Sequence, residues 1–141
     1  MTYFVDRDLG PSVGLALRAV KVSVVLHSER FKPSELDERW IPAVSADGLV
    51  ILTRDRHIRT RPAERAAFEA AGARCFVVTT GASTPLDDLR ALLWAWPPII
   101  QTVADSAAPF MFGVSRDVRL TQYIPLTGPA GPASRGLRPP T

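Results

Sequence analysis

Short apolar runs that alternate with helical patterns are the feature that most constrains the fold of this chain. The clearest run is Leu49–Thr53, a mostly aliphatic segment that ends at the polar pair Arg54-Asp55. Similar runs occupy residues 3–5, 22–26 and 75–79. Such runs predict buried strands, and strands separated by helices pair in parallel through right-handed crossovers. The sequence therefore predicts an α/β domain with a mainly parallel, doubly wound central sheet covered by helices on both faces.

The segments between these runs carry helix signals. Pro11 suits the first turn of a helix that follows the first strand. Ser34 and Asp37 have the spacing of a capping box, which predicts a helix with a kink at Pro42. A third helix is expected from about Pro62 to Ala71, and residues 27–33 are expected to form a loop.

The second half of the chain predicts further helices and a closing hairpin. Helical segments are expected from Pro85, interrupted at Pro97-Pro98. Residues 110–114 and 118–124 read as two strands of an edge hairpin. The last 17 residues contain five prolines and three glycines, so we expect a disordered tail over 125–141 after a single domain over 1–124.

Charge and cysteine content narrow the classes of function. Cys75 is the single cysteine, which excludes an intrachain disulfide, and no Cys/His cluster offers zinc ligation. The net charge of +3 comes almost entirely from arginine, whose planar fork pairs well with phosphate. No segment has the length and apolarity of a membrane span, and the polar stretch from Asp6 to Asp8 argues against a secretory signal. A cytoplasmic protein with an anionic partner is expected.

Aspartates follow the predicted strands at one end of the sheet. Asp6 and Asp8 come directly after the first strand, Asp55 follows the third strand, and Asp37 lies in the first turn of the helix between the second and third strands. In a doubly wound sheet, ligands bind at the carboxyl ends of strands where the strand order reverses, commonly between the first and third strands. Each aspartate taken singly could instead be a loop residue, a turn former or a helix cap.

Converging carboxylates repel one another and raise their pKa values unless a cation lies among them. Mg²⁺ or Mn²⁺ suits oxygen ligands better than Zn²⁺ does. A metal held in this way can activate a bound water and stabilise charge on a phosphodiester, so hydrolysis of RNA or DNA is the expected chemistry.

A basic stretch lies beside Asp55 and is the candidate substrate-binding segment. It could hold RNA phosphates near the metal, since phosphate contacts position a substrate without reading its sequence. The alternatives are a solvated face or ion pairs with Glu64 and Glu69. The candidate residues are Arg54, Arg56, His57 and Arg59.

The segments 3–10, 35–41 and 50–58 resemble the PIN-like domains of VapC-type toxins, and the similarity runs over roughly residues 3 to 68. The resemblance implies a three-layer α/β/α domain with Mg²⁺-dependent endoribonuclease activity. It also implies a cognate antitoxin that covers the site, and a homodimer is compatible with it. Asp6, Asp37 and Asp55 map onto the acidic metal-binding positions, Thr53 would orient a carboxylate or a water, and Asp8 is a further acid.

Two alternatives remain open at this point. PIN domains often carry a fourth acid after the fourth strand. Here the segment between the fourth strand and Asp87 contains no acid, which favours a PIN-like protein-interaction module without catalysis. Trp94 and Trp96 lie in an apolar run that is either core or an interface.

The pattern Asp6-x-Asp8 also occurs in phosphatases that form an aspartyl-phosphate, but these enzymes need a lysine at the strand ends. Lys21 and Lys32 are the only lysines.

Overall fold

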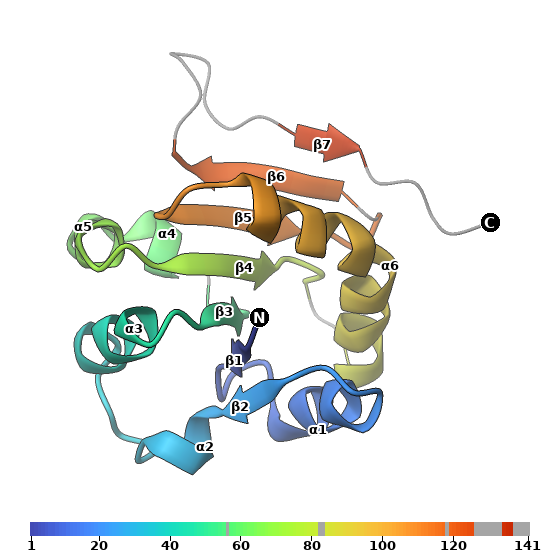
Figure 1. The fold of residues 1–141 in the computed structure, drawn as a ribbon, viewed down its shortest axis with the longest axis horizontal. Coiled ribbons are helices and arrows are strands. Elements are labelled where there is room, and N and C mark those ends of the chain that lie inside the picture. Colours follow the sequence, from blue (N-terminus) through green and yellow to red (C-terminus); the bar gives the residue numbers. More distant parts are fainter. Residues whose placement is uncertain (56, 82–83, 118, 126–133, 137–141) are drawn as a thin grey trace.

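A computed structural model describes residues 1–55, 57–81, 84–117, 119–125 and 134–136. Within these residues a seven-stranded sheet has the order β2-β1-β3-β4-β5-β6-β7, and strands β1 to β5 are parallel (Figure 1). The expected mainly parallel α/β architecture is confirmed. The strands are β1 (Tyr3–Val5), β2 (Val24–Leu26), β3 (Val50–Thr53), β4 (Arg74–Val78), β5 (Phe110–Val114), β6 (Arg119–Ile124) and β7 (Ser134–Gly136).

The order of the strands reverses at β1, and this reversal places the candidate site at the ends of β1 and β3. The chain passes from β1 to β2 on one side and then returns to place β3 on the other side of β1. Val5 pairs with Leu26 of β2 and with Leu52 of β3, so all three strands end at nearly the same level. The residues that follow β1 and β3 therefore lie side by side at the carboxyl edge of the sheet.

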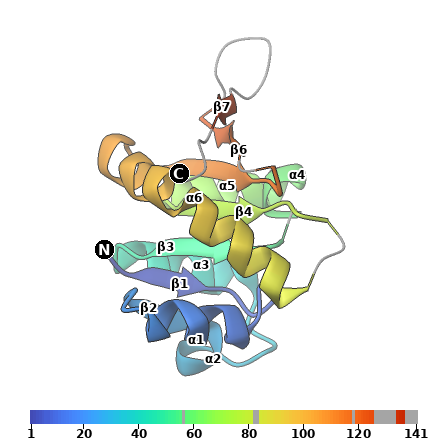
Figure 2. The same cartoon turned by 90° about the vertical axis from the view of Figure 1, so that its right-hand side faces the viewer.

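Helices cover both faces of the sheet and make three layers (Figure 2). Helices α1 (Pro11–Ala19) and α6 (Pro85–Asp105) pack on one face over a core that includes Val5, Leu52 and Phe112. Helices α3 (Asp37–Ala46) and α5 (Pro62–Ala70) pack on the other face over a second core. Alternate residues of each strand enter the two cores because side chains of a strand point to opposite faces.

Two short helices were not predicted. Residues 27–33 were expected to be a loop, but α2 (His27–Arg30) forms one turn there, and α4 (His57–Thr60) forms another turn directly after Asp55. The Glu29 carboxylate accepts a hydrogen bond from the Leu26 backbone N–H and so stabilises the start of α2. Single turns of this kind have too few residues to show a periodic apolar pattern.

Helix α6 continues through Pro97-Pro98, so the expected interruption there was wrong. Its buried residues include Ala91, Ala95, Ile99 and Thr102, which form one continuous stripe against the sheet on both sides of the prolines. Pro97 is exposed, so the helix carbonyl that it leaves without a donor can bind water. Burial of this stripe outweighs the loss of two backbone hydrogen bonds.

The closing hairpin is confirmed, because β5 and β6 pair in antiparallel register from Val114 and Leu120 to Met111 and Ile124. Within the predicted tail, residues 134–136 pair with β6 as β7. Residues 126–133 and 137–141 of that predicted tail lie outside the described residues. In the described part of the chain, no helix combines the length and apolarity needed to cross a membrane.

Candidate metal centre

Thr53 joins the acids that follow β1. Its hydroxyl Oγ1 lies 2.9 Å from Asp6 Oδ2 and 3.0 Å from Asp8 Oδ1, and it accepts a hydrogen bond from the Asp55 backbone N–H at 3.0 Å. A hydroxyl has one hydrogen, so it cannot donate to both carboxylates at once. Both contacts are hydrogen bonds only when one carboxyl group carries a proton.

Of the two carboxyl groups that contact Thr53, Asp6 is the one that holds a proton more readily. Burial and then the nearby Asp8 carboxylate raise its pKa to about 7, although the hydrogen bonds from Thr53 and the Arg7 backbone N–H act in the opposite direction. Only 5% of Asp6 is exposed. The metal-free site thus holds a carboxyl group close to its protonation midpoint at neutral pH, which is the environment that a cation relieves.

A second group of acids lies next to this pair. Carboxylate oxygens of Asp37, Asp55 and Glu64 all lie within 4.8 Å of one another, and all three residues are half-buried. Asp55 follows β3, Asp37 is the first residue of α3, and Glu64 lies in the first turn of α5. Three different elements therefore present oxygens to one point beside the carboxyl edge of the sheet.

Asp37 connects the two groups of acids electrostatically. Burial raises its pKa, and the charges of Asp55, Glu64 and Asp8 raise it further. The Trp40 indole N–H donates to Asp37 Oδ1 at 2.8 Å, which opposes this shift and orients the carboxylate. The predicted capping box was wrong: Leu36 occupies the N-cap position of α3, with no side-chain hydrogen bond at the cap. The Asp37 carboxylate is instead free to face the other acids.

Glu64 was missed as a site residue by the sequence reasoning, which treated it only as an ion-pair partner. That ion pair exists, since Arg61 Nη1 lies 3.2 Å from Glu64 Oε1, and Arg65 pairs with Glu69 in the same way. The other oxygen, Glu64 Oε2, is buried with no hydrogen-bond partner among the described residues. The available signal was its position in the first turn of the helix expected from Pro62, which follows the third strand and Asp55.

The predicted acids and Thr53 are thus brought together, whereas the predicted substrate-binding residues separate. His57 is exposed, and its backbone N–H donates to Asp55 Oδ1 at 2.8 Å, so Asp55 also stabilises the start of α4. The Arg54 side chain turns toward Asp88, with Nη1 3.4 Å from Asp88 Oδ2. Arg56 lies outside the described residues, and the side chain of Arg59 is not described.

The donor set fits a hard divalent cation. Carboxylate oxygens are the ligands that Mg²⁺ and Mn²⁺ prefer, and a buried oxygen without a partner, as at Glu64, is costly unless a ligand satisfies it. Asp37, Asp55 and Glu64 would hold such an ion, and Asp6 and Asp8 add charge beside it. Of the two lysines that the phosphatase alternative could use, Lys21 precedes β2 and so lies at the opposite end of the strands, whereas Lys32 follows α2 and is exposed.

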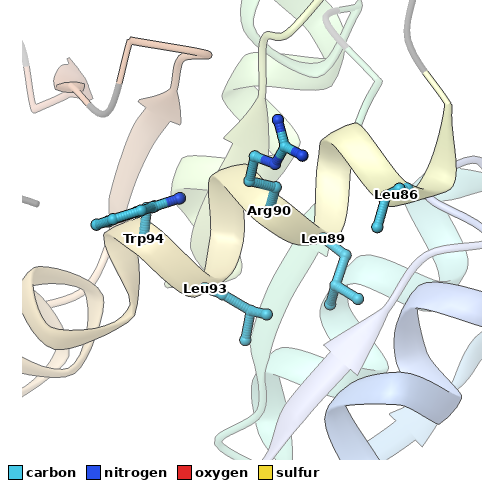
Figure 3. A pocket seen from close by; sticks show the side chains of 5 residues that line it. All are labelled: Leu86, Leu89, Arg90, Leu93 and Trp94. Atoms are coloured by element: carbon cyan, nitrogen blue, oxygen red, sulfur yellow. The ribbon is translucent and has the colours of Figure 1, made fainter. Parts of the chain in front are cut away.

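One pocket lies away from these acids. It has a volume of about 360 Å³ on the outer face of α6 and is lined by Leu86, Leu89, Arg90, Leu93 and Trp94 (Figure 3). Trp96 faces inward instead and packs against Tyr3 with ring centroids 4.8 Å apart. Of the two tryptophans in the apolar run, one therefore contributes to the core and the other to a partly exposed apolar surface.

The sheet is mainly parallel and has a cluster of carboxylates near its strand ends. The family model described as "PIN like domain" matches residues 1–80, and the chain belongs to this family. PIN-like domains are generally nucleases and usually use divalent metals. No curated protein and no solved structure matches the chain. The matched region contains all five site acids and ends before α6.

Thr53 is the residue through which the two groups of acids are aligned, and this alignment can be tested. Thr53→Val keeps the shape of the side chain but removes the hydroxyl that contacts Asp6, Asp8 and the Asp55 N–H. We expect the affinity for Mn²⁺ to fall about 10- to 100-fold, as for other groups that orient metal ligands. Thr53→Ser retains the hydroxyl and is expected to retain the affinity; equal loss in both variants would contradict the role of the hydroxyl.

Proposed function

We propose that this protein is a Mg²⁺-dependent endoribonuclease and the toxin of a VapB/VapC-like toxin–antitoxin pair. The observation that carries the proposal is the convergence of Asp37, Asp55 and Glu64 within 4.8 Å on a PIN-like fold. RNA is the proposed substrate, a cognate antitoxin the proposed partner, and the cytoplasm the proposed location. A homodimer remains compatible with this function.

The side chains have separate roles in this proposal. Asp37, Asp55 and Glu64 hold the cation, and Thr53 orients Asp6 and Asp8 beside it. When bound, the cation supplies an activated water and neutralises charge that develops on the phosphoryl oxygens. The exposed His57, with Arg56 and Arg59, is assigned to the RNA backbone, because phosphate contacts position a substrate at a cleavage site. Asp6, which is 5% exposed and lies beside the three-carboxylate group, would be the proton acceptor for an attacking water.

Metal-dependent cleavage of a mixed RNA pool by the purified, antitoxin-free protein tests the proposal. Cleavage is expected with Mg²⁺ or Mn²⁺, and chelation of the metal is expected to stop it. Single-stranded DNA of matched sequence serves as the comparison substrate. If well-folded protein cleaves no RNA across a range of metals, the nuclease assignment is wrong and a PIN-like protein-interaction module becomes the better assignment.

Binding of Mg²⁺ can be measured without any substrate. A ligand that binds only the folded state stabilises it by about 2.7 kcal/mol when its free concentration is 100 times Kd. We therefore expect the Tm to rise with Mg²⁺ concentration and to saturate, as measured by differential scanning calorimetry. Asp55→Asn should remove most of this rise, whereas Asp105→Asn, at the far end of α6, should keep it. An equal rise in both variants would indicate nonspecific ion binding.

A further inference from the structure

Arg54, which follows β3, contacts both the segment after β4 and the first turn of α6 through its side chain. Its Nη1 lies 3.4 Å from Asp88 Oδ2, and its Nη2 donates to the Gly81 carbonyl oxygen. The Asp88 side chain is only 2% exposed, and its Oδ1 accepts a 2.6 Å hydrogen bond from the Thr80 hydroxyl. Arg54 follows β3, Thr80 and Gly81 follow β4, and Asp88 lies in the first turn of α6. One arginine therefore links three segments behind the metal centre.

The backbone of the same residue lies inside the metal centre. The Arg54 N–H donates to Asp8 Oδ1 at 3.2 Å. Its two neighbours are Thr53, which contacts Asp6 and Asp8, and Asp55, which belongs to the three-carboxylate group. A shift of the Arg54 backbone would consequently move both groups of acids relative to each other. The contacts of the guanidinium restrain this shift.

The choice of residue types agrees with a restraint on geometry. The planar guanidinium reaches a carboxylate and a carbonyl at once, which a lysine ammonium on a flexible stem does less well. Asp88 also has a favourable place near the N-terminus of α6, whose start is stabilised by a capping box between Thr84 and Asp87. Neither exposed nor buried ion pairs add much net stability, so this pair of a partly exposed arginine and a buried carboxylate is better explained by the position that it imposes.

We propose that Arg54 and Asp88 are positioning residues for the metal centre, whose pairing holds the Thr53–Asp55 backbone so that Asp8 and Asp55 face the cation. The inference rests on the proposed metal-dependent function. It also assigns the Arg54 guanidinium, whose side chain is 29% exposed, to Asp88 and the Gly81 carbonyl, and leaves contacts with RNA phosphates to other residues. Asp88 supplies an acid near the end of β4 as the partner of Arg54, where the sequence has none before Asp87.

The test compares Mn²⁺ affinity, measured by isothermal titration calorimetry, with hydrogen exchange of residues 52–56. Arg54→Met, and the double variant Arg54→Met/Asp88→Asn, should each weaken Mn²⁺ binding about tenfold or more and speed exchange in this segment. The double variant leaves no unpaired buried charge, so it retains a folded protein for the measurement. Arg54→Lys should show a smaller loss of affinity than Arg54→Met.

Arg18→Met is the matched control. Arg18 also binds a carboxylate and a backbone carbonyl, at 2.6 Å from Glu29 Oε1 and 2.7 Å from Val24 O, but it lies on α1. It should lower Tm without changing Mn²⁺ affinity. Unchanged affinity and exchange in folded Arg54 variants would overturn the positioning role, and an increased KM for RNA alone would make Arg54 a substrate contact. Mn²⁺ binding without any RNA cleavage by the wild type would refute only the ribonuclease assignment, whereas no Mn²⁺ binding would refute both.

Discussion

Asp37→Asn and Asp55→Asn are each expected to lower the rate of Mg²⁺-dependent RNA cleavage by about 100-fold or more, because charge stabilisation at a reacting centre contributes effects of this size. Each substitution replaces one of three carboxylates that converge within 4.8 Å with a neutral amide, and so lowers the negative charge that attracts the cation. Initial rates on a labelled RNA, at several Mg²⁺ concentrations, provide the measurement. Partial recovery at high Mg²⁺ would show that the loss acts through metal affinity.

Glu38→Gln is the matched control for Asp37→Asn. Glu38 is the next residue of α3, is exposed and lies in the same first turn, but it is not a member of the carboxylate cluster. It should cleave RNA within about twofold of the wild type, since surface substitutions away from special contacts have small effects. Comparable losses in Glu38→Gln and Asp37→Asn would mean that helix α3, rather than the Asp37 carboxylate, is what cleavage depends on.

Asp6→Asn is expected to stabilise the metal-free protein at neutral pH while it impairs RNA cleavage. The pKa of Asp6 is raised from 3.8 to about 7, so the folded state retains a proton that the unfolded chain loses. The stability that depends on this proton is complete below about pH 4 and is lost as the pH rises toward 7. Asparagine resembles the protonated acid at every pH, so the gain should reach a few kcal/mol above pH 7.

Thermal unfolding of both proteins in chelator, from pH 4 to pH 8, measures this effect. The difference in Tm should be small near pH 4 and grow to roughly 5 to 10 °C at pH 8. Saturating Mg²⁺ should reduce the difference, since the cation stabilises ionised Asp6 in the wild type. Asp47→Asn is the control, because Asp47 is 56% exposed and pairs with Arg30 at the surface. A constant difference across this pH range would exclude a raised pKa at Asp6.

Together, these two results would separate the effect of the acids on the stability of the fold from their role in cation binding and RNA cleavage. Buried acids without a cation destabilise the fold, and the same acids are needed for binding the cation. The Asp6 and Thr53 variants act on the pair of acids after β1, whereas the Asp37 and Asp55 variants act on the three-carboxylate group. Different responses of the two sets to Mg²⁺ concentration would identify which group sets the metal affinity.

Much of the fold follows from local signals in the sequence. The apolar runs at Tyr3–Val5 and Val50–Thr53, each followed by aspartates, determined two neighbouring parallel strands whose ends carry the site. Strand alternation with helices also determined the mainly parallel sheet, because parallel strands require crossover connections. The convergence of Asp6, Asp8 and Asp55 near Thr53 needs only this topology, and it was predictable for that reason.

The remaining features depend on contacts between segments that lie far apart in the chain. Helix α6 runs through Pro97-Pro98 because a stripe of buried side chains holds it on the sheet, which no local propensity reveals. Asp37 accepts from Trp40 and faces Asp55 and Glu64 instead of capping its own helix. Glu64 joins the acids only because α5 begins beside the carboxyl edge of the sheet. The sequence by itself thus determined which strands end in acids. The tertiary structure alone decided which carboxylates share one point, because distances between segments depend on how the helices pack.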